Sequence, residues 1–313
     1  MEHSLAPSAL IEDNTEVAPG TTVGPGTWIR FGASLSASTL AGGVFVGFRS
    51  RLDGAHVASG CQIASLARIG RPGAAPVTIG TGAWIGARAV VEPGVRIGPG
   101  AVVAAGAHAV ADVPSGAIVV GRPARVLRRR EFTEDAAPDF TAIIDRVRAR
   151  GDAGRAPLPA HWISRGGGFL DAALSGGPGV SLAAEVITMG RPDGPSSRGG
   201  IRIGARSRIG ARSILEGSGG IDIGPETDLG DGVLVVSSGH DLGRRSLPWQ
   251  EGPVRIGAAV RVGAGATIVG PCRLGDRAVV APDSVVVHDV PADGFTVGVT
   301  PSAGQTRQTR SHP

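Results

Sequence analysis

The stretch PVRIGAAVRVGAGATIVGPCRLGDRAVV, residues 253–280, places an aliphatic residue at every sixth position. These positions are Ile256, Val262, Ile268, Leu274 and Val280, and a glycine or alanine usually follows. An α-helix repeats every 3.6 residues and an extended strand every two, so neither accounts for a period of six. The segment therefore needs a structure whose own unit is six residues long.

The same period extends through both halves of the chain. Earlier examples are Ile79, Ile85, Val91, Ile97 and Val103. Such a repeat is typical of a parallel β-helix, in which each unit forms a short strand and a tight corner. Three units close a triangular coil, and successive coils stack about 4.8 Å apart. The sequence therefore predicts an all-β fold of left-handed parallel β-helix (hexapeptide-repeat) type.

The two halves of the chain match each other. PVTIGTGAWIG from Pro76 corresponds to PVRIGAAVRVG from Pro253, and DVP occurs at the same spacing, from Asp112 and from Asp289. We therefore predict two β-helices joined by a short helix and a linker. The expected division is an N-terminal β-helix at 1–130, a helix and linker at 131–175, a C-terminal β-helix with a catalytic loop at 176–302, and a disordered tail at 303–313.

A helix is expected in the connection between the halves. Asp139 can cap it, with Phe140, Ile143, Ile144 and Val147 on one face and Gly151 at its end. A loop-rich linker follows, in which we expect Trp162 to dock on another part of the chain.

Composition excludes several classes of function. All 31 basic residues are arginine, the formal net charge is only +4, and the run Arg128 to Arg130 has no interleaved aromatic residues. Nucleic-acid binding is therefore not expected. The N-terminal stretch has no basic start, and no segment reaches the roughly 18 apolar residues of a membrane span. We expect a soluble cytoplasmic protein without a membrane partner.

The two cysteines do not indicate a metal site or a disulfide framework. Cys61 and Cys272 lie far apart without C-x-x-C spacing, and each falls at a small inward position of the repeat. We expect both to be core residues and no metal to be bound.

The interruption SSGHDLGRRSLPWQEG, residues 237–252, is the candidate site, because a packed β-helix has no interior room for a ligand. Counting from Val235, His240 should face outward. An imidazole there could serve as a general base. Its second nitrogen needs a hydrogen-bond acceptor, for which we expect Asp222, with Glu216, Asp241 or a backbone carbonyl as alternatives.

The motifs together resemble a known family. SGHD followed by PVRIGAAVRVGAGATIVGPCRLGDRAVVAPDSVVVHDVP is similar to the hexapeptide-repeat acyltransferases, notably maltose and galactoside O-acetyltransferases and polysaccharide O-acetyltransferases. The first half resembles them through PVTIGTGAWIGARAVVEPGVRIGPGAVV and the ending GRPA at Gly121 to Ala124. The resemblance covers most of the chain outside the linker.

The resemblance implies a left-handed β-helix, a homotrimer, and acetyl-CoA as the acyl donor in the groove between neighbouring β-helices. The family's catalytic histidine maps onto His240, and the acceptor pocket onto the loop with Arg244, Arg245 and Trp249. The implied cofactor-binding residues are Arg261, Gly263, Ala264, Ala281 and His288. The family's tryptophan in this region is replaced by Arg261 in the second half, whereas the first half retains Trp84.

The first half is expected to lack the base. Aligning QIAS at Gln62 with VVSS at Val235 leaves it about four residues short and puts Ala67 opposite His240. We therefore expect a non-catalytic copy that supplies oligomer contacts or part of a composite groove.

The predicted function is acetyl-CoA-dependent O-acetylation of a sugar or a small hydroxylated metabolite. An N-acetyltransferase acting on an amino sugar is the nearest alternative, because the same base and thioester serve an amine. A zinc carbonic anhydrase needs three histidine ligands, and only His240 is suitably placed. A non-catalytic β-helix scaffold is the remaining alternative.

Overall fold

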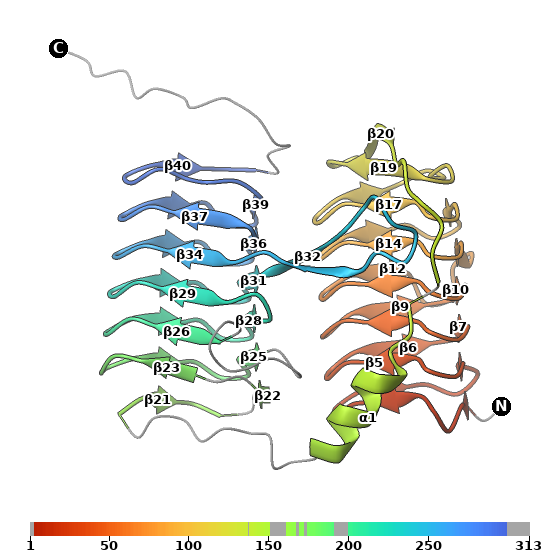
Figure 1. The fold of residues 1–313 in the computed structure, drawn as a ribbon, viewed down its shortest axis with the longest axis horizontal. Coiled ribbons are helices and arrows are strands. Elements are labelled where there is room, and N and C mark those ends of the chain that lie inside the picture. The colour runs from red at the N-terminus through yellow and green to blue at the C-terminus, as the bar shows by residue number, and fades with distance from the viewer. Residues whose placement is uncertain are drawn as a thin grey trace.

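Short strands stack in two columns that stand side by side and rise in the same direction (Figure 1). The computed structural model describes residues 3–136, 138–150, 161–166, 169–171, 174–190 and 200–298. It confirms the predicted all-β fold of two parallel β-helices and is consistent with their left-handed coil. The expected tail at 303–313 lies outside the described residues.

The N-terminal copy has three parallel sheets, which we name A, B and C in chain order. Sheet A contains β1 (Ser4–Leu5), β4 (Thr22–Val23), β7 (Thr39–Leu40), β10 (Ala55–Val57), β13 (Val77–Ile79) and β16 (Arg96–Ile97). Sheet B contains β2 (Leu10–Ile11), β5 (Trp28–Ile29), β8 (Phe45–Val46), β11 (Gln62–Ile63), β14 (Trp84–Ile85), β17 (Val102–Val103), β19 (Ala117–Val120) and the antiparallel β20 (Arg125–Arg129). Sheet C contains β3 (Glu16–Val17), β6 (Ser34–Ser36), β9 (Arg51–Asp53), β12 (Arg68–Gly70), β15 (Val90–Val91) and β18 (His108–Ala109).

The C-terminal copy repeats this arrangement in sheets A′, B′ and C′. Sheet A′ contains β23 (Leu174–Gly176), β26 (Ile201–Ile203), β29 (Ile221–Ile223), β34 (Val254–Ile256) and β37 (Cys272–Leu274). Sheet B′ contains β21 (Ile163–Ser164), β24 (Ser181–Leu182), β27 (Arg208–Ile209), β30 (Asp228–Leu229), β35 (Arg261–Val262), β38 (Val279–Val280) and β40 (Phe295–Thr296). Sheet C′ contains β22 (Phe169–Asp171), β25 (Ile187–Met189), β28 (Ile214–Glu216), β31 (Leu234–Val236), β36 (Thr267–Val269) and β39 (Val285–Val286).

Each copy has its own aliphatic core, formed by the residues of the six-residue repeat. Ile79, Ile85 and Ile256, for example, are almost completely buried. Cys61 and Cys272 are free and lie within these cores, and burial raises the pKa of each thiol to about 12. Both cysteines are therefore inert core residues.

The glycines of the repeat have two separate roles. Gly86 directly follows the aliphatic residue, and a Cβ there would lie 2.5 Å from the backbone nitrogen of Ala105 in the next coil. Gly82 lies in the corner at φ +64°, a conformation that residues with a Cβ rarely adopt. The first role keeps adjacent coils close, and the second turns the chain.

Strand order shows which parts of the two copies are equivalent. β13 corresponds to β34, so the strands before them, β12 and β31, also correspond, as do sheets C and C′. Residues 71–76 follow β12, whereas residues 237–253 follow β31. The alignment of Gln62 with Val235 is therefore shifted by one strand, since it matches β11 rather than β12 with β31. The shift arises because neighbouring repeats resemble each other. The first copy lacks the whole loop, and buried Ala67 has Val233 as its counterpart.

The C-terminal β-helix begins before the expected boundary at 176. β21 already pairs with β24, with Ile163 opposite Ser181. Trp162 is buried against this first coil, where its Nε1–H donates to the Gly177 carbonyl at 3.1 Å. The irregular spacing of the first coils hides them from a six-residue pattern.

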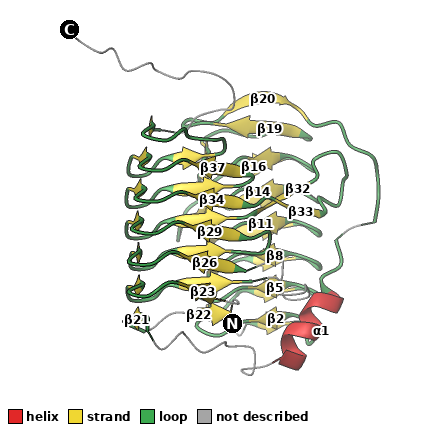
Figure 2. Ribbon diagram, turned by 60° about the vertical axis from the view of Figure 1, so that its left-hand side comes forward, coloured by secondary structure: helices red, strands yellow, loops and turns green. Residues whose placement is uncertain are grey.

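The connection between the copies descends from β20 to helix α1 (Thr141–Arg150) (Figure 2). Asp139 caps α1 as predicted, with Oδ1 accepting from the Thr141 N–H at 2.9 Å. Arg148 donates to the carbonyls of Pro7 and Ala9, which ties α1 to the first coils of the N-terminal copy. The expected end at Gly151 lies outside the described residues.

The two copies share an apolar contact. Phe48 and Ala87 from corners between sheets B and C pack against Ile187, Ile214 and Leu234 of sheet C′, and all five are buried. We call these five residues the interdomain cluster. It joins the B side of the first copy to the C′ side of the second.

Hydrogen bonds flank the interdomain cluster. Arg49 donates to the carbonyls of Glu185 and Arg212 at 2.9 and 3.1 Å, and Arg88 donates to the Gly232 carbonyl. Gly106 allows close approach, since a Cβ there would lie 2.7 Å from Val285 Cγ2. The packing of the two copies is therefore specific.

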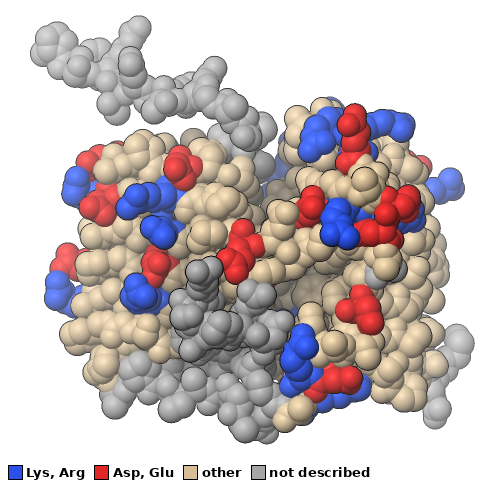
Figure 3. All heavy atoms as spheres, in the orientation of Figure 1, with Lys and Arg blue, Asp and Glu red and all other residues tan. Residues whose placement is uncertain are grey.

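The surface shows mixed charge. On the face drawn in Figure 3, arginine and acidic side chains are interspersed over the C-terminal copy. Among the described residues no helix combines the length and the apolar character needed to cross a bilayer.

Candidate functional site

The interruption of the repeat forms a hairpin that bridges the two copies (Figure 1). It leaves the C-terminal copy after β31 and returns at β34. Its two strands, β32 (Ser238–His240) and β33 (Trp249–Glu251), pair antiparallel, with His240 opposite Trp249. We call residues 237–253 the bridging loop.

The tip of the bridging loop is fixed by the chain that follows β20. Thr133 and the loop exchange backbone hydrogen bonds, from Thr133 N–H to the Gly243 carbonyl and from Arg245 N–H to the Thr133 carbonyl. Asp135 accepts from the N–H and hydroxyl of Ser246 at 2.7 and 2.6 Å. These hydrogen bonds hold the pKa of the Asp135 carboxyl below its ordinary value.

Arg130 adds a buried anchor under the same loop. Its guanidinium donates to the carbonyls of Leu242, at 2.6 Å, and of Arg244, while a third N–H reaches the Gly100 carbonyl. One side chain of the first copy thus holds the loop and its own coil together.

The imidazole of His240 is oriented by a backbone carbonyl. Its Nδ1 lies 2.7 Å from the Leu247 carbonyl oxygen, which can only accept, so Nδ1 carries the proton. The neutral ring then has its lone pair on Nε2. The same carbonyl also accepts from Gln62 Nε2 of the first copy at 3.3 Å. The bridging loop therefore sets the tautomer that a general base requires.

The surroundings keep this ring neutral. Burial lowers the pKa of His240 below its ordinary value, the hydrogen bond to Leu247 opposes this, and the charge of Arg130 lowers it further. Trp84 of the first copy packs edgewise on the ring, with centroids 4.9 Å apart and planes at 61°. A neutral imidazole can accept a proton near pH 7.

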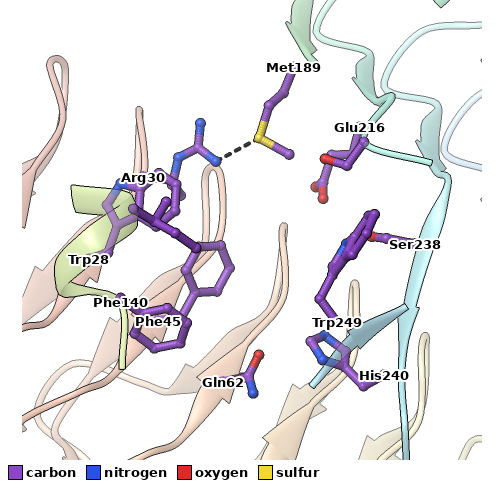
Figure 4. A pocket seen from close by; sticks show the side chains of 12 residues that line it. Trp28, Arg30, Phe45, Gln62, Phe140, Met189, Glu216, Ser238, His240 and Trp249 are labelled. Atoms are coloured by element: carbon purple, nitrogen blue, oxygen red, sulfur yellow. Dashed lines mark hydrogen bonds between the residues drawn. The ribbon is translucent and has the colours of Figure 1, made fainter. Parts of the chain in front are cut away.

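His240 lines a cavity of about 290 Å³ between the two copies (Figure 4). The first copy and α1 with its preceding residue supply one wall, and the second copy supplies the other. The lining residues are Trp28, Arg30, Phe45, Gln62, Phe140, Ile143, Met189, Glu216, Ser218, Ser238, His240 and Trp249. The volume lies just below the range of 300–1,000 Å³ typical of small-molecule sites, so the cavity fits a small ligand.

Aromatic rings occupy much of the wall from the first copy. Trp28 and Phe45 are cross-strand neighbours in sheet B, and Phe140 packs against Phe45 in a tilted arrangement with ring centroids 5.9 Å apart. Glu12 fixes this wall by accepting from Trp28 Nε1 at 2.9 Å and pairing with Arg30 at 2.6 Å. Arg30 lies over the Trp28 ring and reaches the Met189 sulfur of the second copy.

Glu216 faces this wall from sheet C′. Its carboxyl group points from the second copy toward the side formed by Trp28 and Arg30 (Figure 4). Burial raises the pKa of Glu216, while a hydrogen bond from Ser65 and the charge of Arg30 oppose the rise. Its Oε1 is buried and has no hydrogen-bond partner within the described part of the chain.

The structure brings some of the expected catalytic residues together and separates others. Asp222 lies on β29 in sheet A′, half exposed and paired with Arg202 at 3.2 Å. Asp241 follows His240, but its carboxylate accepts from the Gly243 N–H. The backbone carbonyl, weighed as an alternative partner for the imidazole, occupies that position, and Glu216 lines the same cavity without bonding to the ring.

Of the three residues expected to bind the acceptor, one lines the cavity and two do not. Trp249 lines the cavity beside His240. Arg244 and Arg245 turn outward to Asp135 and Glu134 at 2.9 and 3.0 Å, and neither lines the cavity. Their position indicates a role in holding the loop.

Most of the residues expected to bind the cofactor lie on or next to sheet B′, away from the cavity that His240 lines. Arg261 belongs to sheet B′, is exposed and faces Asp228 at 3.6 Å, and Gly263, Ala264 and Ala281 lie in the corners beyond sheet B′. His288 follows β39, and its Nδ1 is buried without a hydrogen-bond partner among the described residues.

Sequence reasoning missed three residues of the first copy that contact the loop: Gln62, Trp84 and Arg130. The sequence contained a signal for Trp84, because the first half keeps a tryptophan at the position where the second half has Arg261. It contained none for Gln62 and Arg130, since only the packing of the two copies brings them to the loop. The described residues contain no group of three histidine, cysteine or acidic side chains that could hold a metal ion.

Two protein-family models match the chain. The bacterial transferase hexapeptide (six repeats) model covers residues 76–108, and the hexapeptide repeat of succinyl-transferase covers residues 200–237 and 253–286. Both copies thus contain the repeat.

A curated relative is the 2,3,4,5-tetrahydropyridine-2,6-dicarboxylate N-acetyltransferase of Staphylococcus aureus, which is 41% identical over 92 residues. The match covers 29% of this chain and 38% of that enzyme.

Solved structures resemble parts of the chain at low identity. An N-acyltransferase, AntD, from Bacillus cereus, in complex with dTDP and 3-hydroxybutyryl-CoA, is 20% identical with a TM-score of 0.38, covering 41% of this chain and 83% of that one. A hexapeptide transferase family protein from Anaplasma phagocytophilum is 21% identical with a TM-score of 0.37, covering 41% and 78%.

Proposed function

We propose that this chain, whose two copies both contain the hexapeptide repeat, is a hexapeptide-repeat acyltransferase that transfers an acyl group from acyl-CoA to a small acceptor. The observation that carries the proposal is the His240 ring, which donates from Nδ1 to a backbone carbonyl and lines a cavity between the copies. Acetyl-CoA is the proposed donor.

His240 would act as the general base. Its Nε2 takes the proton from the acceptor hydroxyl or amine as that atom attacks the thioester carbon. The tetrahedral intermediate then collapses, the C–S bond breaks, and the imidazolium returns the proton to the leaving thiolate. The products are an acyl ester or amide and free CoA thiol.

Both acceptor chemistries remain in the proposal. O-acetylation of a sugar hydroxyl follows from the resemblance of the motifs, and the matched relative favours an amine, because it is named as an N-acetyltransferase. The size of the cavity and its aromatic lining suit one small ring in either case.

The donor would lie beside Trp84, with His288 as the candidate contact for a CoA phosphate. Trp84, Gly86, Ala87 and Ala104 occupy the positions in the first copy that Arg261, Gly263, Ala264 and Ala281 occupy in the second. Trp84 packs against His240, which favours the first copy as the donor wall, whereas Ala87 is buried in the interdomain cluster.

In this proposal one chain supplies the whole site. The expected homotrimer would supply a groove between subunits, whereas the cavity at His240 lies between the two covalently joined copies. We therefore expect one molecule of CoA to bind per chain, whatever the oligomeric state.

The test is the release of CoA thiol from acetyl-CoA with a panel of small alcohols and amines. His240→Ala should lower kcat at least about a hundredfold, the lower end of a general base's contribution. His240→Asn should lose as much, although its amide can still donate to the Leu247 carbonyl. Near-normal turnover in either variant would remove His240 as the base, and no turnover in the wild type would favour a scaffold.

A further inference from the structure

The buried charges around the cavity are unbalanced. Among the described residues that line it, one guanidinium, Arg30, and one carboxyl group, Glu216, are charged groups, and Glu12 lies behind Arg30. Arg30 and Glu12 pair at 2.6 Å, with side chains only 3% and 8% exposed. Glu12 therefore neutralises Arg30, and Glu216 is left without a full counter-ion.

The hydrogen bonds of Glu216 are also incomplete. A carboxylate can accept about four hydrogen bonds, and Ser65 supplies one, while Oε1 has no partner in the described structure. A buried carboxyl oxygen without a donor costs free energy unless a ligand supplies one. Burial raises the pKa of Glu216, and an ammonium group bound beside it would favour the ionised form and lower that pKa again.

The walls around Glu216 suit a cation. Phe45, Phe140 and Trp249 present aromatic rings to the cavity, while Arg30 already lies over the ring of Trp28. Aromatic faces attract organic cations, most strongly where water is excluded. A carboxylate set among aromatic rings combines charge pairing with this attraction, which a neutral alcohol would not gain.

Glu216 and His240 both lie in the cavity wall formed by the second copy, at different positions along it. Glu216 projects from β28 and His240 from β32, and Trp249 lies between them in the view of Figure 4. Both residues line the same cavity of about 290 Å³, so a small ring that fills it can present one substituent to each.

We propose that Glu216 selects the acceptor by binding a protonated amine on it, while a second group of that acceptor, a hydroxyl or an amine, meets His240. The acceptor is thus a small cyclic molecule with an ammonium group, of the size of one amino sugar. This inference rests on the proposed function for the identity of the ligand as an acceptor. The charge selection itself does not depend on catalysis.

The experiment measures equilibrium binding without acyl donor, by ligand-observed NMR at pH 7.5. The probes are matched pairs of ammonium and alcohol, cyclohexylamine with cyclohexanol and benzylamine with benzyl alcohol. The wild type should bind each amine at least tenfold more tightly than its alcohol. Glu216→Gln keeps the shape but removes the charge, and it should reduce this preference below threefold.

The matched control is Glu226→Gln. Glu226 is an exposed corner residue of the same copy, paired with Arg206, and lies outside the cavity lining. This variant should keep the full amine preference. Thermal unfolding midpoints establish that both variants are folded.

The outcomes separate the two proposals. Absence of an amine preference in the wild type, including absence of binding, overturns the role of Glu216, as does a preference that survives Glu216→Gln. If His240-dependent thiol release then persists with alcohols, acyl transfer still stands. An amine preference lost only in Glu216→Gln, in a chain without acyl transfer, keeps the Glu216 site and removes the proposed reaction.

Discussion

A single carbonyl oxygen, that of Leu247, links the candidate base to both copies. It accepts from the imidazole of His240 and from the amide of Gln62. Leu247 is buried at φ +53°, so the loop holds this carbonyl in an unusual backbone conformation. A backbone acceptor adds no full charge, so it orients the ring and raises the pKa of His240 less than a carboxylate would.

The acid limb of the pH–rate profile should reflect this environment. Burial and Arg130 place the pKa of His240 below its ordinary value of 6.5, so the ring is already neutral at pH 7. We expect kcat to be level around neutral pH and to fall only below pH 6.5, as protonation removes the Nε2 lone pair. Measuring kcat rather than kcat/KM restricts the profile to groups in the bound complex, including Glu216. A midpoint above 6.5, or a limb that survives in His240→Asn, would contradict this assignment.

At the scale of elements, the place of the bridging loop in the chain could be predicted, but its contacts could not. The broken period marks residues 237–252, and the outward position of His240 follows from counting. The docking of the tip on Thr133 and Asp135 depends on a connection that has no repeat. The hydrogen-bond partner of the imidazole could not be predicted from the sequence, because a hairpin of unknown register could offer several acceptors.

Gln62 should matter more to this element than the visible ion pairs at its tip. It is 7% exposed and donates to the carbonyls of Ser246 and Leu247 at 3.1 and 3.3 Å. Leaving buried carbonyls without these donors costs about 1–3 kcal/mol, and we expect Gln62→Ala to lower kcat about tenfold. The loop should also become more susceptible to limited proteolysis.

Arg245→Ala is the contrast, because its pair with Glu134 is largely exposed and such pairs contribute little. We expect less than a twofold change in kcat. Equal effects of the two substitutions would mean that the exposed ion pairs, rather than the buried amide, hold the loop.

At the scale of the molecule, each copy keeps only one half of a groove. Sheet B presents Trp28, Phe45, Gln62 and Trp84 in cross-strand register, whereas the equivalent positions of sheet B′ are Ser181, Arg208, Asp228 and Arg261. Conversely, sheet C′ presents Ile187, Ile214 and Leu234 where sheet C has Ser34, Arg51 and Arg68. The first copy supplies the aromatic wall of the cavity, and the second copy supplies the bridging loop.

This division explains the limit of what the sequence could predict. The six-residue period and the duplication follow directly from spacing, so the fold was accessible. The family resemblance predicts base and donor contacts in the same copy, and sequence alone gives no information on which faces meet. Side-by-side packing brings the B face of the first copy to the C′ face of the second, where Trp84 meets His240.

Substitutions at equivalent positions of the two copies test whether sheet B, rather than sheet B′, forms the donor wall. Trp84→Ala removes an edgewise aromatic contact worth about 0.5–1.5 kcal/mol and opens the wall beside the base, so kcat/KM for acetyl-CoA should fall about tenfold. Arg261→Ala, at the same position of the other copy, changes an exposed face and should alter it less than twofold. Unfolding midpoints show whether each variant is folded. If Arg261→Ala has the larger effect on kcat/KM, the donor binds along sheet B′, and the groove within the chain is not the site of transfer.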